Sequence, residues 1–258
     1  MKERALAISN GSIGYMHKGK PVAVVSDIDV SLHKGELVSL IGRNGAGKST
    51  LLRTIAAFQQ QLKGEFTIEG RNIADYSTHG MARLVSVVLS NADIAPLTVR
   101  ELVSLGRTPH VGLLGRLAAK DKRVVEQAME LMGVTQFASR MITTLSDGER
   151  QKCMIAKALA QETPIILLDE PTAFLDYPSK VRLLRMLKEL AQTTGKAVLV
   201  STHDIEIAFA LTDKVWLLDN GHLYEGTLEE LQNNGALQRF IDCDIMRYNT
   251  TDNKIEII

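Results

Sequence analysis

One stretch of the sequence places glycines, a lysine and a hydroxyl side chain at a spacing that suits phosphate binding. Lys48 and Ser49 end the pattern G-x-x-x-x-G-K-[ST], which begins at Gly42. Glycines allow a tight backbone turn whose N–H groups point at phosphate oxygens. Lys48 supplies a mobile positive charge for the β- and γ-phosphates, and the Ser49 hydroxyl can ligate Mg²⁺. We therefore predict a nucleotide-binding loop composed of Gly42, Arg43, Asn44, Gly45, Ala46, Gly47, Lys48, Ser49 and Thr50.

The elements on either side of this loop are predicted to be a strand and a helix, which is the context that the motif needs. The strand is Glu36–Ile41, and the helix runs from Ser49 to about Ala57. The first turn of the helix adds unpaired N–H groups and the positive end of the helix dipole. A glycine-rich turn that binds nothing is the alternative, and the flanking elements make it the weaker interpretation.

Two carboxylates follow another apolar segment. Ile165–Leu168 is predicted to be a strand, and Asp169 and Glu170 come directly after it. In a parallel sheet this position is the edge at which ligands bind. Asp169 suits Mg²⁺, directly or through water, and Glu170 could orient or deprotonate an attacking water. The alternative is a solvated acidic turn, which the nearby phosphate loop disfavours.

Further strands and helices alternate along the chain. Strands are predicted at Leu6–Ser9, Val24–Leu32, Phe66–Ile68, Arg71–Ile73, Leu84–Leu89, Lys196–Ser201, Lys214–Leu218 and Leu223–Glu225, with a glycine-rich turn at Asn10–Gly14. Helices are predicted at Val99–Leu105, Ala119–Met132, Asp147–Ala160, Ser179–Thr194 and Leu228–Asn233. Strands that end in polar residues and alternate with helices predict an α/β fold with a parallel sheet.

The same pattern predicts one domain over residues 1–258. Its core is expected in residues 1–90 and 161–234, and residues 91–160 are expected to form an inserted helical subdomain. The tail, residues 235–258, can form a last hairpin from Cys243–Tyr248 and Lys254–Ile258, and no function is assigned to it.

Composition excludes several classes of function. The 30 basic residues balance the 30 acidic ones, so no global field draws the chain to nucleic acid or anionic lipid. Cys153 and Cys243 stand far apart, form no metal or redox motif, and favour a reducing compartment. The charged N-terminus leads into no apolar signal region, and no apolar run reaches the roughly 18 residues of a membrane span. We expect a soluble chain whose membrane role, if any, comes through a partner.

A third motif makes the interpretation specific. Leu145-Ser146-Asp147-Gly148-Glu149 lies before the Asp169-Glu170 strand, and Ser201-Thr202-His203-Asp204 ends a later strand. In order, the phosphate loop, Leu-Ser-x-Gly-[Gln/Glu], Leu-Leu-Asp-Glu-Pro-Thr, Leu-Asp and Ser-Thr-His-Asp resemble the nucleotide-binding subunit of ABC transporters, from about Leu6 to Gln232. The resemblance implies a P-loop NTPase core with a mostly parallel sheet, an antiparallel β subdomain and an inserted helical subdomain.

In that family two subunits enclose two ATP molecules, each between one phosphate loop and the other subunit's signature. The resemblance therefore implies γ-phosphate contacts in trans for Ser146, Gly148 and Glu149. A hydroxyl at a helix N-terminus is suited to an anion, and a simple helix cap at Ser146 is compatible with that role. His203 is implied to be the switch histidine that contacts the γ-phosphate, although a lone histidine is more often structural.

Two other positions match the family less directly. Asp176, in Ala173-Phe174-Leu175-Asp176, matches the family's loop that joins the two active sites across the dimer. Tyr15 corresponds to the aromatic residue that stacks on adenine, with a surface or packing tyrosine as the alternative.

Two positions depart from the family pattern. Ser90 stands where the family usually has a glutamine that ligates Mg²⁺, so a serine hydroxyl would reach the metal only through water or not at all. Asp147 stands where glycine is usual in the signature. Its carboxylate either points away from the nucleotide or weakens dimer closure by repelling phosphate.

Pro96–His110 resembles the helical subdomain of ATPases that serve iron–siderophore, haem and cobalamin importers. This resemblance implies hydrolysis of ATP with Mg²⁺, coupled to import of a metal chelate. The implied partners are a second copy, integral-membrane permease subunits and an external substrate-binding protein, but no nucleic acid. The implied location is peripheral, on the cytoplasmic face of the cell membrane. Alternatives are a non-transport ABC ATPase, such as an iron–sulfur cluster assembly factor or a translation or repair ATPase, and a nucleotide-gated scaffold with negligible turnover.

Overall fold

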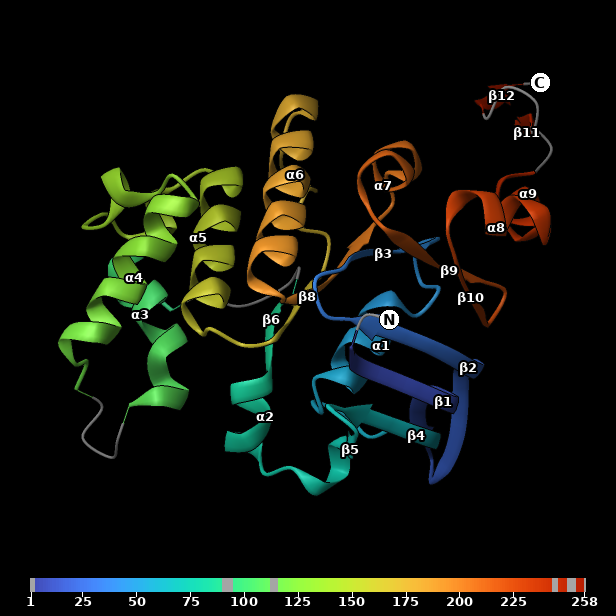
Figure 1. The fold of residues 1–258 in the computed structure, drawn as a ribbon, viewed down its shortest axis with the longest axis horizontal. Coiled ribbons are helices and arrows are strands. Elements are labelled where there is room, and N and C mark those ends of the chain that lie inside the picture. Colours follow the sequence, from blue (N-terminus) through green and yellow to red (C-terminus); the bar gives the residue numbers. More distant parts are fainter. Residues whose placement is uncertain (1–2, 90–94, 112–115, 243–245, 250–253, 258) are drawn as a thin grey trace.

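Two β-sheets and the helices packed on them form the body of the protein (Figure 1). The computed structural model describes residues 3–89, 95–111, 116–242, 246–249 and 254–257. Within these ranges no helix is both long and apolar enough to cross a membrane. The predicted α/β class, with a mostly parallel sheet beside an antiparallel one, is confirmed.

The larger sheet has six strands in the order β10-β9-β3-β8-β7-β6. Its strands are β3 (Leu37–Gly42), β6 (Val85–Val88), β7 (Ile165–Leu168), β8 (Ala197–Thr202), β9 (Lys214–Asp219) and β10 (His222–Gly226). All neighbouring pairs are parallel except β10 with β9. Every residue of β3, β7 and β8 is buried, which is why these strands have continuous apolar sequences.

Alternate residues of the central strands point into different hydrophobic cores, as the two-residue period of a strand requires. Leu37 and Val198 belong to the core that contains α5 and α6, whereas Val38, Leu40 and Leu199 belong to the core shared with the antiparallel sheet. The helix α1 (Lys48–Ile55) packs into the second core. The six-stranded sheet is thus covered on both faces, and its polar loops are left at the strand ends.

The antiparallel sheet has the order β2-β1-β4-β5, with β1 (Arg4–His17), β2 (Lys20–His33), β4 (Lys63–Ile68) and β5 (Arg71–Asn72). The turn predicted at Asn10–Gly14 is wrong, because β1 continues through it with shifts in its pairing with β2. Gly14 allows close pairing there, since a Cβ atom would lie 2.0 Å from the carbonyl oxygen of Val22. The actual turn is at Lys18 and Gly19, both with positive φ, the two-residue geometry typical of hairpins.

Helices α3 (Val99–Ser104), α4 (Ala119–Leu131) and α5 (Asp147–Ala160) lie together at one end of the molecule (Figure 1). The predicted boundaries hold within one residue, and Thr98 and Glu101 form a capping box at the start of α3. The sequence prediction missed α2 (Thr78–Leu84), whose capping residue is Ser77. The strand predicted from Leu84 therefore begins at Val85.

The buried Arg107 side chain joins α4 to the C-terminal end of α5 within this helical group. Its guanidinium pairs with the Asp121 carboxylate of α4 at 3.0 Å and donates to the carbonyl oxygen of Ala160 at 2.7 Å. Both partners of the ion pair are almost completely buried. The guanidinium also contacts the Glu162 carboxylate at 2.7 Å, so its charge is paired on two sides.

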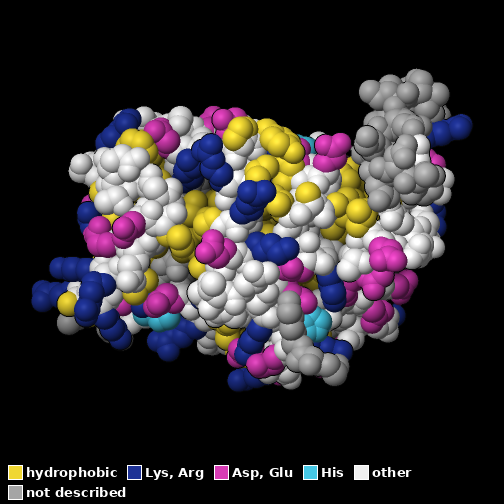
Figure 2. All heavy atoms as spheres, turned by 45° about the horizontal axis from the view of Figure 1, so that its top comes forward, with side chains coloured by type: hydrophobic (Ala, Val, Ile, Leu, Met, Phe, Trp, Pro, Cys, Tyr) yellow, Lys and Arg dark blue, Asp and Glu magenta, His cyan; other side chains and the backbone are white. Residues whose placement is uncertain are grey.

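The remaining helices are α6 (Tyr177–Thr194), α7 (Ile205–Leu211), α8 (Leu228–Asn233) and α9 (Ala236–Ile241). Helix α6 begins two residues earlier than predicted, because Asp176 caps it and proline is tolerated in a first turn. The tail forms the expected hairpin from β11 (Met246–Asn249) and β12 (Lys254–Ile257). On the face drawn in Figure 2, basic and acidic side chains are interspersed with patches of hydrophobic ones.

Candidate nucleotide-binding site

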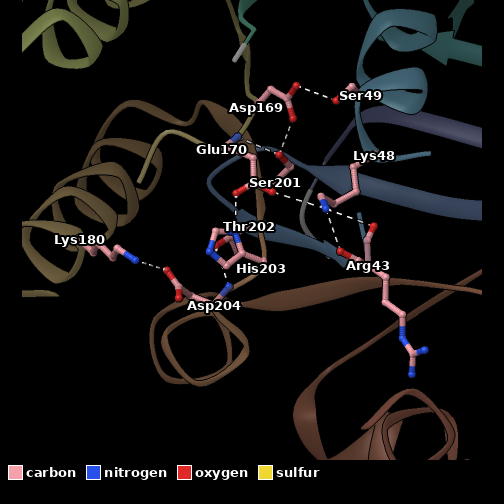
Figure 3. Close-up of polar contacts among 11 residues, drawn as sticks. Arg43, Lys48, Ser49, Asp169, Glu170, Lys180, Ser201, Thr202, His203 and Asp204 are labelled. Carbon is pink, nitrogen blue, oxygen red and sulfur yellow. Dashed lines mark hydrogen bonds and ion pairs between the residues drawn. The ribbon is translucent and has the colours of Figure 1, made fainter. Parts of the chain in front are cut away.

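The ends of three parallel strands bring the predicted site residues together. The phosphate loop follows β3, Asp169 and Glu170 follow β7, and His203 follows β8, which lies between those two strands. Figure 3 shows their side chains converging at this edge of the sheet. The parallel sheet thus explains why motifs about 120 residues apart in the sequence share one site.

The phosphate loop has the backbone shape that glycine permits. Gly45 and Gly47 have φ of +79° and +108°, and Gly47 is the residue before α1. A Cβ atom on Gly47 would lie only 2.9 Å from the Val24 side chain. Lys48 is buried, and its Nζ donates to the carbonyl oxygen of Gly42 at 2.8 Å. The loop therefore holds the lysine charge beside the N–H groups of the α1 N-terminus.

Asp169 is held by two serine hydroxyls. Ser49 Oγ donates to its Oδ2 at 2.8 Å, and Ser201 Oγ donates to its Oδ1 at 2.6 Å. Mg²⁺ typically binds one or two protein oxygens together with substrate phosphates, and the Ser49 hydroxyl with the Asp169 carboxylate fits that donor set. The sequence analysis named Ser201 only within the Ser-Thr-His-Asp motif and gave it no role, although a serine near the end of an otherwise apolar strand was a usable signal.

The Glu170 carboxylate lies between two cationic or protonatable side chains. Its Oε1 is 3.4 Å from Lys48 Nζ, and its Oε2 is 2.9 Å from His203 Nδ1. The backbone N–H of Glu170 donates to Ser201 Oγ at 2.9 Å. Glu170 has a φ of +50°, which is uncommon for a residue with a side chain. The surrounding hydrogen bonds hold the carboxylate at the mouth of the phosphate loop.

Two of the predicted nucleotide-binding residues direct their side chains differently. The Tyr15 hydroxyl forms a 2.7 Å hydrogen bond with Thr50 Oγ1 in α1, and the residue remains 54% exposed. Arg43 turns away from Lys48, as Figure 3 shows, and donates to the carbonyl oxygen of Phe240 in α9 at 3.0 Å. The ring is thus available to a base, whereas the guanidinium links the loop to the C-terminal helix.

The signature residues form the N-terminus of α5. Ser146 caps the helix, and the Glu149 carboxylate accepts from the Ser146 hydroxyl at 2.7 Å and its backbone N–H at 2.9 Å. These hydrogen bonds lower the pKa of Glu149 below 4.5. Asp147 pairs with Arg150 on the next turn, which compensates the carboxylate charge. Among the described residues, none of these pairings reaches the phosphate loop of the same chain.

The loop before α6 lies against the signature. A Cβ atom on Gly148 would be 3.2 Å from the Leu175 side chain and 3.3 Å from the carbonyl oxygen of Phe174. Asp176 accepts from the backbone N–H of Ser179 at 3.0 Å, and hydrogen bonds from Ser179 lower the pKa of that carboxyl group. Phe174 remains 57% exposed beside these groups. Ser90 lies outside the described residues.

Comparisons with known proteins agree with this geometry. Residues 25–173 match the family model for ABC transporters. The iron(3+)-hydroxamate import ATP-binding protein of Bacillus subtilis is 35% identical over 93% of this chain and 88% of its own length. The hemin import ATP-binding protein of Streptomyces coelicolor is 40% identical over 81% of this chain and 73% of its own length. A dimeric structure of a bacterial ABC transporter cassette, 27% identical, aligns with a TM-score of 0.77 over 86% of this chain and 98% of that one. The chain belongs to the ABC transporter family, among its ATP-binding subunits.

Proposed function

We propose that this chain hydrolyses ATP to drive import of an iron chelate, haem or cobalamin. The observation that carries the proposal is the position of the Glu170 carboxylate, within 3.4 Å of Lys48 and hydrogen-bonded to His203. A carboxylate, a lysine and a histidine at the mouth of a phosphate loop are the groups that phosphoryl transfer to water needs.

Binding would rest on the loop and its two neighbours. The N–H groups of residues 42–49 and the Lys48 ammonium would hold the β- and γ-phosphates, and Tyr15 would stack on adenine. Ser49 and Asp169 would hold Mg²⁺, which neutralises charge on the phosphates when bound. Ser201 keeps the Asp169 carboxylate oriented toward Ser49 through its own hydrogen bond.

Hydrolysis would rest on Glu170 and His203. Water attacks the γ-phosphorus, its proton passes to the Glu170 carboxylate, and the bond between the γ-phosphorus and the bridging oxygen breaks to release ADP. His203 would contact a γ-phosphate oxygen while its Nδ1 stays within hydrogen-bond distance of Glu170. The main contributions are thus positioning and charge stabilisation.

A second copy of this chain would complete each site. The hydroxyl and helix N-terminus at Ser146 form an anion-binding edge that makes no contact with its own phosphate loop among the described pairings. In the proposed dimer, Ser146, Gly148 and Glu149 face the γ-phosphate held by the partner, and Asp176 lies between the two sites. The exposed Phe174 and Tyr177 flank Asp176 and would become buried there.

The membrane partner would dock beside α2. A hollow of about 430 Å³ lies between the end of α1 and α2, and its lining includes Phe58, Met81 and Val87. Phe58 is 65% exposed, so an apolar helix from a permease would bury it. In this proposal residues 91–160 form the inserted helical subdomain and residues 1–90 with 161–234 the core. The chain would sit peripherally on the cytoplasmic face of the membrane, with an external protein delivering the cargo.

The proposal is tested by reconstituting the chain with its permease in vesicles that enclose ATP and Mg²⁺. Chelated iron, haem and cobalamin are then offered outside with the cognate binding protein. We expect one cargo to accumulate and to raise ATP turnover. Turnover without uptake of any cargo would instead support the non-transport ABC ATPases.

A further inference from the structure

An ion pair links α6 to the residue that follows His203. Lys180 Nζ lies 2.8 Å from Asp204 Oδ2, and the two side chains are 17% and 27% exposed. Figure 3 shows the pair lying beside His203, on the side away from the phosphate loop. None of the roles proposed above uses Lys180.

Because the Asp204 carboxylate pairs with Lys180, it does not cap the helix that follows. Asp204 occupies the capping position of α7, where an aspartate normally accepts a hydrogen bond from the helix N-terminus. Here it forms no such bond, and its carboxylate is held by Lys180 instead. Its backbone N–H donates to Thr202 Oγ1 at 3.1 Å. Residues 202–204 are therefore held by a hydrogen bond within the segment and by the ion pair to α6.

His203 itself has little else to hold it. Its side chain is 57% exposed, so packing restricts the ring weakly. The ring position therefore depends on the backbone of residues 202–204 and on the 2.9 Å contact with Glu170. If Lys180 were removed, the Asp204 carboxylate would be free to cap α7, and the backbone next to His203 would shift with it.

The other end of the link lies one turn from the loop that carries Asp176. The backbone N–H of Lys180 donates to the carbonyl oxygen of Asp176 at 2.9 Å, in the capped first turn of α6. Lys180 thus connects the first turn of α6 with the loop of His203.

We propose that Lys180 is a positioning residue for His203, acting through Asp204. This inference rests on the proposed ATP hydrolysis, in which His203 contacts the γ-phosphate. Lys180 touches neither the nucleotide nor the reacting atoms. Its role is to keep the imidazole within reach of Glu170 and to make that position depend on the first turn of α6.

The same helix offers a matched control. Lys188 lies two turns further along α6 and pairs with Asp213 at 3.1 Å, with exposures of 31% and 22%. Asp213 accepts a hydrogen bond from the backbone N–H of Leu37, and within the described part of the chain its hydrogen bonds and ion pairs reach none of the site residues. Lys188→Met therefore removes an equivalent ion pair without disturbing residues 202–204.

The experiment compares Lys180→Met, Lys180→Arg and Lys188→Met in the full chain. We expect Lys180→Met to lower kcat for ATP about tenfold or more, with KM changed less than about threefold, because misplacing a catalytic group by about 1 Å can cost 10²-fold. Lys180→Arg should restore most of kcat, and Lys188→Met should match wild type. Equal kcat values in the two Met variants would overturn the inference.

A second readout does not require turnover. NMR signals of the His203 imidazole, assigned with His203→Gln, should move in Lys180→Met and stay in place in Lys188→Met. Unchanged His203 signals in Lys180→Met would overturn the inference even if the wild-type chain is active. Conversely, a wild-type chain without ATP turnover would contradict the proposed function, whereas a selective shift of the His203 signals would still support the link.

Discussion

The Ser201 hydroxyl provides a sharp test of how the site is held together. Ser201 is fully buried, donates to Asp169 Oδ1 at 2.6 Å and accepts from the backbone N–H of Glu170 at 2.9 Å. A hydrogen bond to a charged group contributes about 1.5–3 kcal/mol, and the Glu170 N–H would lose its acceptor as well. We therefore expect Ser201→Ala to lower the free energy of unfolding by about 2–3 kcal/mol.

Ser39 provides the control on the neighbouring strand. It is also fully buried, but its hydroxyl has no hydrogen-bond partner within the described part of the chain. Because an unpaired buried hydroxyl is unfavourable, Ser39→Ala should leave stability unchanged or raise it by up to about 1 kcal/mol.

The assay is urea unfolding of both variants, with the slope of the transition checked for constancy. Nucleotide turnover by the same samples should fall in Ser201→Ala and remain in Ser39→Ala. A loss of stability in Ser201→Ala no larger than that in Ser39→Ala would refute the argument that Ser201 organises Asp169 and Glu170.

Two further predictions concern Tyr15, which we propose to stack on adenine, and the buried ion pair of Asp121. Tyr15→Ala should weaken ATP binding about tenfold, since stacking contributes about 1–3 kcal/mol per base, whereas Tyr15→Phe should retain most of the affinity in a fluorescent-nucleotide titration. Burial alone would raise the pKa of Asp121, but the hydrogen bond from the Ala118 N–H and the contacts with Arg107 outweigh it and lower the pKa below 3.8. The contribution of ionised Asp121 to the free energy of unfolding is therefore complete above the ordinary pKa of 3.8, which applies to the unfolded chain. It is lost as the pH falls through the lower pKa of the folded state. As the pH is lowered through that range, the unfolding midpoint should fall more steeply for wild type than for Asp121→Asn. Parallel curves of midpoint against pH would contradict this.

The strands and loops of the site were predictable because their signals are local. Asp169 and Glu170 directly follow the apolar run Ile165–Leu168, so they can be placed at the edge of a parallel sheet even when the strand order is unknown. Likewise, Ser146 and Glu149 have the spacing of a capping box, which is typical of a helix start such as that of α5.

Other features depend on contacts between distant segments. The sequence indicates a turn at Asn10–Gly14, but β1 continues through it and Gly14 permits close pairing with β2, which only the paired structure reveals. Arg43 was expected as part of the nucleotide-binding loop, and its side chain reaches Phe240, 197 residues later, a contact that no local pattern indicates. The hydrogen bond from Ser201 to Asp169 joins the ends of two parallel strands, and the ion pair from Lys180 to Asp204 joins α6 to the segment after β8. No sequence pattern pairs these segments.

The central claim is that Glu170 takes the proton of the attacking water. Loss of a general base typically lowers the rate by about 10²–10⁴-fold. We therefore expect Glu170→Gln to bind ATP as tightly as wild type while single-turnover hydrolysis falls by about that factor, and to accumulate an ATP-bound dimer. Glu189→Gln, an exposed change on α6, should behave as wild type. Undiminished single-turnover hydrolysis in Glu170→Gln would contradict the account.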